Sequence, residues 1–174
     1  MVTILFCGRF DGVVDDLEAA LGRQHVILRM GNGCIRQNRP GRPDYLLLTG
    51  GMPATIELPQ LLLVLAGGMA GPVCPRIASG AVALVDSADG EALALAGRLR
   101  LKTVTVGLGR TDTLTCASRR EEGTMLSLQR SIRSLSGRRY EPADIPMPPL
   151  RHPRTALLLG AILLLSDRVE MLKG

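Results

Sequence analysis

The chain has 174 residues, of which 46% are hydrophobic and 21% are charged, and these ordinary proportions exclude an intrinsically disordered protein. Only 2% are aromatic, so the core must be aliphatic and binding by stacked bases is not expected. The surplus positive charge lies in residues 98–154 and is typical either of a solvated basic face or of a surface for an anionic ligand. Because the basic residues are dispersed, we do not expect nucleic-acid binding.

The length predicts a single domain, residues 1–174. No segment reaches the roughly 20 apolar residues that a membrane-crossing helix needs, since the longest apolar run is Ala156–Leu165. The first residues carry neither a basic region nor a long apolar region and do not resemble a signal peptide. We therefore expect a cytoplasmic protein with no membrane partner.

The first half of the chain alternates between strand and helix patterns. Gly12–Leu21 has apolar residues at helical spacing after Asp11, a suitable N-cap, and Gly22 is a suitable stop. Gly31–Pro43 is expected to be a loop, and Leu58–Ala66 a buried helix with Pro59 in its first turn. Strands are predicted at Val2–Cys7, His25–Met30 and Asp44–Thr49.

In the second half, strands at Ala81–Val85 and Thr103–Leu108 flank an alanine- and leucine-rich helix, Asp89–Leu99. Two segments that alternate with period two, Thr113–Ser118 and Thr124–Arg130, predict a hairpin. A proline-rich connector, residues 142–149, then leads to a helix from Thr155 to about Leu172 that must be buried. The pattern predicts a Rossmann-like, three-layer α/β fold with a mainly parallel sheet and a small antiparallel hairpin excursion.

The turn after the first strand, Gly8–Gly12, is where a parallel sheet of this kind could bind phosphates. A phosphate-cradling loop needs a lysine and a hydroxyl group after its last glycine, and neither is present. The carboxylate of Asp11 would also repel a phosphate. The turn is therefore interpreted as a tight entry into a capped helix.

The end of the fourth predicted strand carries Asp86, Ser87 and Asp89, which are candidate ligand-binding residues at the rim of the sheet. They could bind a ribose hydroxyl, a base or a cation, or they could cap the following helix, and capping is favoured for Asp89. His152 is a further candidate for ligand binding or acid–base chemistry, although a lone histidine before a buried helix is more often structural. No catalytic residue is assigned.

Cysteine and histidine side chains offer no metal site in the sequence. The two histidines lie in different halves of the chain, and none of the four cysteines forms a C-x-x-C pair. We expect buried, reduced thiols, no bound metal and no cofactor. The cysteines are Cys7, Cys34, Cys74 and Cys116.

Two segments of the chain resemble the central, ATP-binding domain of the Mur ligases. Ala81–Gly109 is similar to the stretch in which a strand leads to an N-x-D-D motif, a helix and a strand ending in glycine. Ile145–Ile162 is similar to the later stretch in which a P-G-x-H-N motif opens an alanine-rich helix. The resemblance extends over about residues 1–172 and implies the fold of that domain.

The chain departs from the Mur ligase pattern at the positions that carry catalysis. The family's G-T-N-G-K-T loop is replaced by Gly8–Gly12, only Asp89 continues the N-x-D-D motif, and Pro153 follows His152 where the motif has asparagine. We expect no counterpart of the family's C-terminal domain in these 174 residues. The resemblance therefore implies a catalytically silent relative.

The leading functional prediction is a non-catalytic protein that binds a protein partner or a small ligand. A homo-oligomer is also expected, because the apolar last helix has few elements to cover it. The alternative is an enzyme or regulator that binds a nucleotide or another anion at the rim of the sheet, using Asp86, Asp89 and an arginine from residues 98–154.

Overall fold

The structure is a computed structural model that describes residues 1–10, 12–31, 33–68, 76–120, 123–150 and 153–169. The chain divides into two compact units. Unit 1 comprises Met1–Val85 and Asp89–Thr103, and unit 2 comprises Asp86–Ala88 and Val104–Gly174. The succession of strands and helices forms an α/β fold with a mostly parallel sheet and an antiparallel excursion, which confirms the predicted fold class.

Six strands of unit 1 lie side by side in the order β8-β6-β1-β4-β2-β3. All neighbours are parallel except β3, which pairs antiparallel with β2 at the edge. A separate parallel pair consists of β5 (Thr55–Ile56) and β7 (Arg76–Ile77). The bounds of the six strands are β1 Val2–Cys7, β2 Ile27–Gly31, β3 Cys34–Gln37, β4 Tyr45–Gly50, β6 Leu61–Leu65 and β8 Val82–Asp86.

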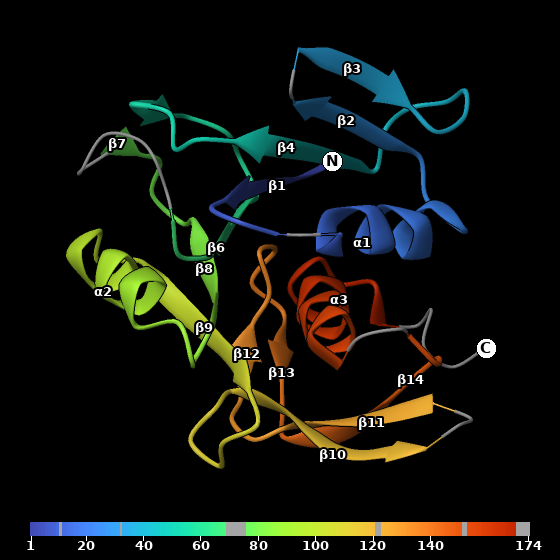
Figure 1. Ribbon diagram of the computed structural model, residues 1–174, viewed down its shortest axis with the longest axis vertical. Coiled ribbons are helices and arrows are strands. Elements are labelled where there is room, and N and C mark those ends of the chain that lie inside the picture. Colours follow the sequence, from blue (N-terminus) through green and yellow to red (C-terminus); the bar gives the residue numbers. More distant parts are fainter. Residues whose placement is uncertain (11, 32, 69–75, 121–122, 151–152, 170–174) are drawn as a thin grey trace. The chain divides into compact units, whose positions relative to one another are not determined.

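The central strands of unit 1 are apolar and buried along most of their length, as expected for parallel strands covered on both faces. On one face, Leu63 of β6 and Ala83 of β8 share a hydrophobic cluster with Ala92 and Leu95 of helix α2. Helix α1 buries its own apolar stripe at the predicted spacing. Figure 1 shows α1 (Val13–Gly22) and α2 (Gly90–Arg98) on opposite sides of β6 and β8.

The prediction of a buried helix at Leu58–Ala66 is wrong, because this segment contains strand β6. All five of its residues pair in parallel with β1 on one side, four of them, Leu62–Leu65, pair in parallel with β8 on the other, and all five are buried. A short apolar run has no periodicity that separates a buried strand from a buried helix. Two neighbouring strands, from distant parts of the sequence, provide the hydrogen bonds that make this segment extended.

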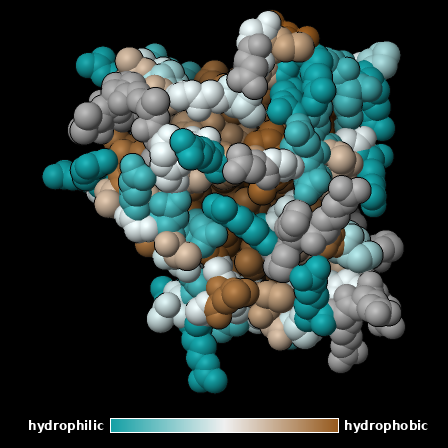
Figure 2. All heavy atoms as spheres, viewed as in Figure 1, coloured by the Kyte–Doolittle hydropathy of each residue, from teal (hydrophilic) through white to brown (hydrophobic). Residues whose placement is uncertain are grey.

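The segment predicted as a loop, Gly31–Pro43, contains the edge strand β3. Gly33, directly before β3, has a φ of 72°. An Asn-Gly pair between two strands is typical of a two-residue hairpin turn, so the sequence did carry a signal for this strand pair. All four residues of β3 are exposed, and Figure 2 shows hydrophilic side chains gathered over β2 and β3.

Unit 2 contains the predicted hairpin within a larger group of strands. Its strands lie in the order β9-β10-β11-β14, with β9 and β10 parallel and the other pairs antiparallel. A small antiparallel pair, β12 (Ile132–Arg133) with β13 (Arg139–Tyr140), is separate. The bounds are β9 Lys102–Gly107, β10 Leu114–Arg120, β11 Gly123–Leu128 and β14 Ala143–Met147.

The proline-rich connector is also more ordered than predicted, because it includes strand β14. Pro146 has no N–H group to donate, and an edge strand tolerates it for that reason. Strand β14 pairs with β11 from Ala143 to Met147. The extended connector thus completes the small sheet of unit 2.

Helix α3 (Pro153–Leu165) packs against β10, β11 and β14 and ends earlier than the predicted Leu172. A Cβ atom at Gly160 would overlap Leu126, so the missing side chain lets helix and strand approach closely. Every residue from Thr155 to Leu165 is buried within the single chain. Burial of this helix therefore does not require a second copy. No helix in the described part of the chain is long and apolar enough to cross a membrane.

Candidate functional site

The turn after β1 is tightly packed against the end of β6. Gly8 has a φ of 115°, and a Cβ atom there would overlap the carbonyl oxygen of Ala66. The backbone N–H of Arg9 donates to the carbonyl of Gly67 over 3.3 Å. Only glycine combines this backbone conformation with so close an approach. The turn is thus held against its neighbour by its own backbone.

Helix α1, which follows this turn, offers little to an anion. Its N-cap is Gly12, with a φ of 72° and no side-chain cap, while the predicted cap, Asp11, lies outside the described residues. The first turn carries Asp15 and Asp16. These carboxylates oppose the attraction that the positive end of the helix dipole would exert on a phosphate.

Asp89 caps α2, as favoured from the sequence. Its Oδ1 accepts a hydrogen bond from the N–H of Ala92 over 3.0 Å. Its Oδ2 accepts a second one from the N–H of Gly67 over 2.5 Å. Glu91 accepts in the same way from the N–H of Gly68 over 3.1 Å. Asp89 therefore caps the helix, and the two carboxylates together hold the turn that follows β6.

Asp86 and Ser87 belong to unit 2, whereas Asp89 belongs to unit 1. Oδ1 of Asp86 accepts from the N–H of Ala88 over 3.0 Å, and Oδ2 lies 3.3 Å from Nε of Arg154, in the first turn of α3. Both charged groups keep contact with solvent, with 23% of the Asp86 side chain and 42% of the Arg154 side chain exposed. A ligand could reach this ion pair.

Ser87 faces the end of β9, close to Asp112, a residue that was not predicted as part of a site. The N–H of Ser87 donates to the carbonyl of Val106, and a Cβ atom at Gly107 would overlap both Oγ of Ser87 and Oδ2 of Asp112. Asp112 is only 2% exposed and accepts from the N–H of Gly109 over 2.8 Å. The signal in the sequence was two glycines, Gly107 at the end of β9 and Gly109 three residues before this aspartate.

The remaining residues singled out in the sequence are His152 and three cysteines. His152 lies outside the described residues, as does Cys74. Cys34 is exposed, so the expectation of buried thiols is wrong for this residue, and Cys116 is half-buried. Within the described ranges, no three histidine, cysteine, aspartate or glutamate side chains are grouped as a metal site would require.

Two groups near the turn after β1 have pKa values that burial or pairing shifts. Burial raises the pKa of Cys7 to about 12, so this thiol, which contacts the sulfur of Met52, stays protonated near neutral pH. Hydrogen bonds to Asp15 and then Glu18 raise the pKa of Arg29 further above its usual value. Neither group is set up for nucleophilic or acid–base chemistry.

No family model and no curated protein matches the sequence. Solved structures do match its fold. The chain is 12% identical to UDP-N-acetylmuramoyl-L-alanyl-D-glutamate–2,6-diaminopimelate ligase, with a TM-score of 0.56, and the match covers 99% of this chain and 46% of that one. UDP-N-acetylmuramoylalanyl-D-glutamyl-2,6-diaminopimelate–D-alanyl-D-alanyl ligase from Acinetobacter baumannii gives a TM-score of 0.52 at 12% identity, with the same two coverages.

A third match, folylpolyglutamate synthase from Mycobacterium tuberculosis in complex with ADP, has a TM-score of 0.48 at 13% identity and covers 97% of this chain and 56% of that one. The chain spans about half the length of the ligases that it matches. The resemblance seen in the sequence is confirmed at the level of the fold: the chain has the α/β fold of the central domain of Mur ligases.

Proposed function

We propose that this chain is a non-catalytic protein with a Mur-ligase-like fold that acts in the cytoplasm by binding a protein partner. The observation that carries the proposal is a set of hydrogen bonds at the carboxyl ends of the strands of unit 1, which we call the fastened rim. Asp89 and Glu91 hold the N–H groups of Gly67 and Gly68, and Arg9 is bonded back to Gly67. Backbone N–H groups that bind carboxylates of the chain itself are not available to bind phosphates.

The charges around the turn after β1 support the same proposal. The chain has two lysines, Lys102 and Lys173, and neither is near this turn in the sequence. The nearest helix begins with Asp15 and Asp16. A phosphate-cradling loop for a nucleoside triphosphate needs a lysine and a hydroxyl group after its last glycine, and the only cation in this turn is Arg9.

Calorimetric titration with Mg·ATP tests the absence of ligase chemistry. We expect no measurable heat of binding in the micromolar range, and no phosphate release in a coupled assay. A micromolar dissociation constant would contradict the proposal. Mass spectrometry of the protein isolated under native conditions tests the binding of a protein partner. A stoichiometric protein partner is expected, whereas a retained nucleotide would contradict the proposed function.

A second copy of the chain is one such partner, and we keep homo-oligomerisation as a prediction. Light scattering over a wide concentration range is expected to give a mass above that of the monomer. A mass that stays at the monomer value would contradict self-association. It would not contradict the binding of a different protein, because α3 is already buried within one chain.

The second candidate function is binding of a nucleotide or another anion by unit 2, and the ion pair between Asp86 and Arg154 favours it. An anion that replaces the carboxylate of Asp86 could bind the guanidinium group of Arg154, with Ser87 close to Asp86 in the sequence. Titration with pyrophosphate tests this function. Arg154→Gln should abolish binding, whereas Arg110→Gln, which removes an exposed charge elsewhere in the unit, should not.

A further inference from the structure

Unit 1 has a pocket at the amino ends of its strands, opposite to the rim described above. Two connections form it: the turn that enters β8, Ile77–Ala81, and the segment that joins α2 to β9, Leu99–Lys102. Its volume is about 520 Å³. This size lies within the range that small-molecule sites commonly have, about 300–1,000 Å³.

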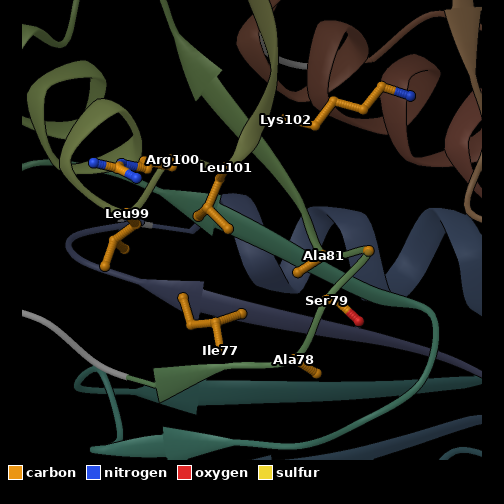
Figure 3. Close-up of a pocket in the computed structure, with 9 residues that line it drawn as sticks. Ile77, Ala78, Ser79, Ala81, Leu99, Arg100, Leu101 and Lys102 are labelled. Carbon is orange, nitrogen blue, oxygen red and sulfur yellow. The ribbon is translucent and has the colours of Figure 1, made fainter.

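The lining of the pocket is apolar on one side and polar at the margins. Ile77, Leu99 and Leu101 are partly buried and pack on the hydrophobic cluster of unit 1, so the pocket is an open extension of the core. In Figure 3 the side chain of Leu101, in the segment before β9, extends toward Ile77. The charged ends of Arg100 and Lys102 lie to either side of this apolar wall.

The backbone at Arg100 is unusual for a residue with a side chain. The helix α2 ends in a Schellman motif, in which the N–H of Leu101 donates to Ala96 and the N–H of Arg100 donates to Gly97. Arg100 occupies the left-handed position of this motif, with a φ of 52°. Glycine is the usual residue there, and a side chain makes the conformation less favourable by about 1–2 kcal/mol.

Hydrogen bonding within the chain does not explain this arginine. Among the described residues, none accepts a hydrogen bond or forms an ion pair with its guanidinium group, and the residue is exposed. The Schellman motif explains the left-handed backbone, but the side chain of Arg100 makes no hydrogen bond or ion pair with a described residue that would explain why arginine rather than glycine stands there. A side chain kept at such a position points to a role outside the fold. The group that Arg100 offers is a planar cation beside an apolar wall.

The charges around the pocket favour an anion. Arg76 precedes the lining residue Ile77, and Arg98 precedes Leu99. Strand pairing brings one acidic residue, Glu57, toward the pocket. It follows Ile56 of β5, which pairs with Ile77 of β7 and accepts a hydrogen bond from the N–H of Ala78. The carbonyl groups that would make the end of α2 negative already accept hydrogen bonds from residues 99–101.

We propose that this pocket binds a small aliphatic carboxylate, whose chain packs on Ile77, Leu99 and Leu101 and whose carboxylate pairs with Arg100. The proposal goes beyond the proposed function and does not depend on it, because the site lies at the opposite ends of the strands from the fastened rim. Titration with Mg·ATP and titration with a carboxylate therefore succeed or fail separately.

The test is an NMR titration of the ¹⁵N-labelled chain with sodium octanoate and, in parallel, with octanol. Octanoate should bind saturably and shift the amide signals of residues 77–81 and 99–102. Octanol has the same chain without the charge, and should bind about tenfold more weakly, as loss of one charge-assisted hydrogen bond implies. Equal binding of the two, or shifts spread over other residues, would overturn the proposal.

Variants of Arg100 separate its charge from its backbone. Arg100→Gly keeps the left-handed conformation and should weaken octanoate binding about tenfold without loss of folding, whereas Arg100→Lys should retain most of it. Arg98→Gln is the matched control, because it removes a cation from the same helix end but does not line the pocket. Unchanged octanoate binding in Arg100→Gly would contradict the proposed site. An equal loss in Arg98→Gln would also contradict it, because the loss would then follow from the net charge and not from the position of Arg100.

Discussion

The ends of helices α2 and α3 have the same backbone geometry but use it differently. In α3 the N–H groups of Asp167 and Arg168 donate to Leu164 and Leu163, which repeats the bonding at the end of α2, and Asp167 has a φ of 60°. The Asp167 carboxylate accepts hydrogen bonds from Tyr140 and Ser136. At the corresponding position of α2, Arg100 has no such bond to any described residue. A left-handed residue can therefore serve the fold in one place and remain available for a ligand in another.

The largest effect should follow from removing the carboxylate at the end of α3. Asp167→Ala deletes two hydrogen bonds to a charged acceptor and keeps the unfavourable backbone, so we expect a loss of about 2–3 kcal/mol in the free energy of unfolding. Urea denaturation measures it. Tyr140→Phe should reproduce part of the loss, and a neutral result for both would mean that these bonds do not stabilise the helix end.

A smaller loss is expected at the start of α2. Asp89→Ala removes the cap and also the bond to the N–H of Gly67, which should lower the free energy of unfolding by about 1–2 kcal/mol. Asp89→Asn keeps one acceptor oxygen for the two N–H groups and should fall between. Thermal denaturation that finds both variants as stable as wild type would contradict the double role of Asp89 seen in the structure.

Arg100→Gly should act in the opposite direction. Glycine relieves the left-handed strain but gains freedom in the unfolded chain, and the balance is a stabilisation of about 1 kcal/mol. The same substitution at Asp167 should destabilise, because the bonds to Tyr140 and Ser136 are lost with the side chain. If Arg100→Gly lowers the melting temperature, the side chain of Arg100 stabilises the folded state, and the contrast with Asp167 would be contradicted.

The last effect is absent near neutral pH and appears only in alkali: it concerns Cys7, a buried group that stabilises the fold in its neutral form. Its pKa is about 12 in the folded chain, against 9.0 for a thiol that is fully exposed to water, so the unfolded state loses its proton first as the pH rises. The contribution of the neutral thiol is complete below about pH 9 and is lost as the pH approaches 12. Denaturation at alkaline pH should show a shallower decline for Cys7→Ala than for wild type.

The sequence predicted seven of the fourteen strands in the described part of the chain, because the patterns of these seven were local. Val2–Cys7 is a strand as predicted, and Ala81–Val85 matches β8 to within one residue. The hairpin of β10 and β11 followed from period-two alternation. Leu58–Ala66 failed, because an apolar run of this length fits a buried helix as well as a buried strand, and only its neighbours β1 and β8 decide between them.

The contacts of the candidate site could likewise be predicted only where they are local in the sequence. The capping role of Asp89 could be predicted, since its partner Ala92 is three residues away. Its bond to Gly67 spans 22 residues, and the pairing of Asp86 with Arg154 spans far more, so no local pattern shows them. Asp112 was missed because its burial depends on how closely Gly107 lets the chain approach.

The sequence by itself determined the class of fold, the amphipathic helices and the lack of a phosphate-binding lysine near Gly8, because these depend on residue type and short-range spacing. Only the tertiary structure decided that Asp89 and Glu91 fasten the rim and that Arg100 stands in a left-handed conformation beside a pocket. The physical reason is that hydrogen bonds and cavities form between segments that are distant in the chain, and the sequence states which groups exist but not which ones meet.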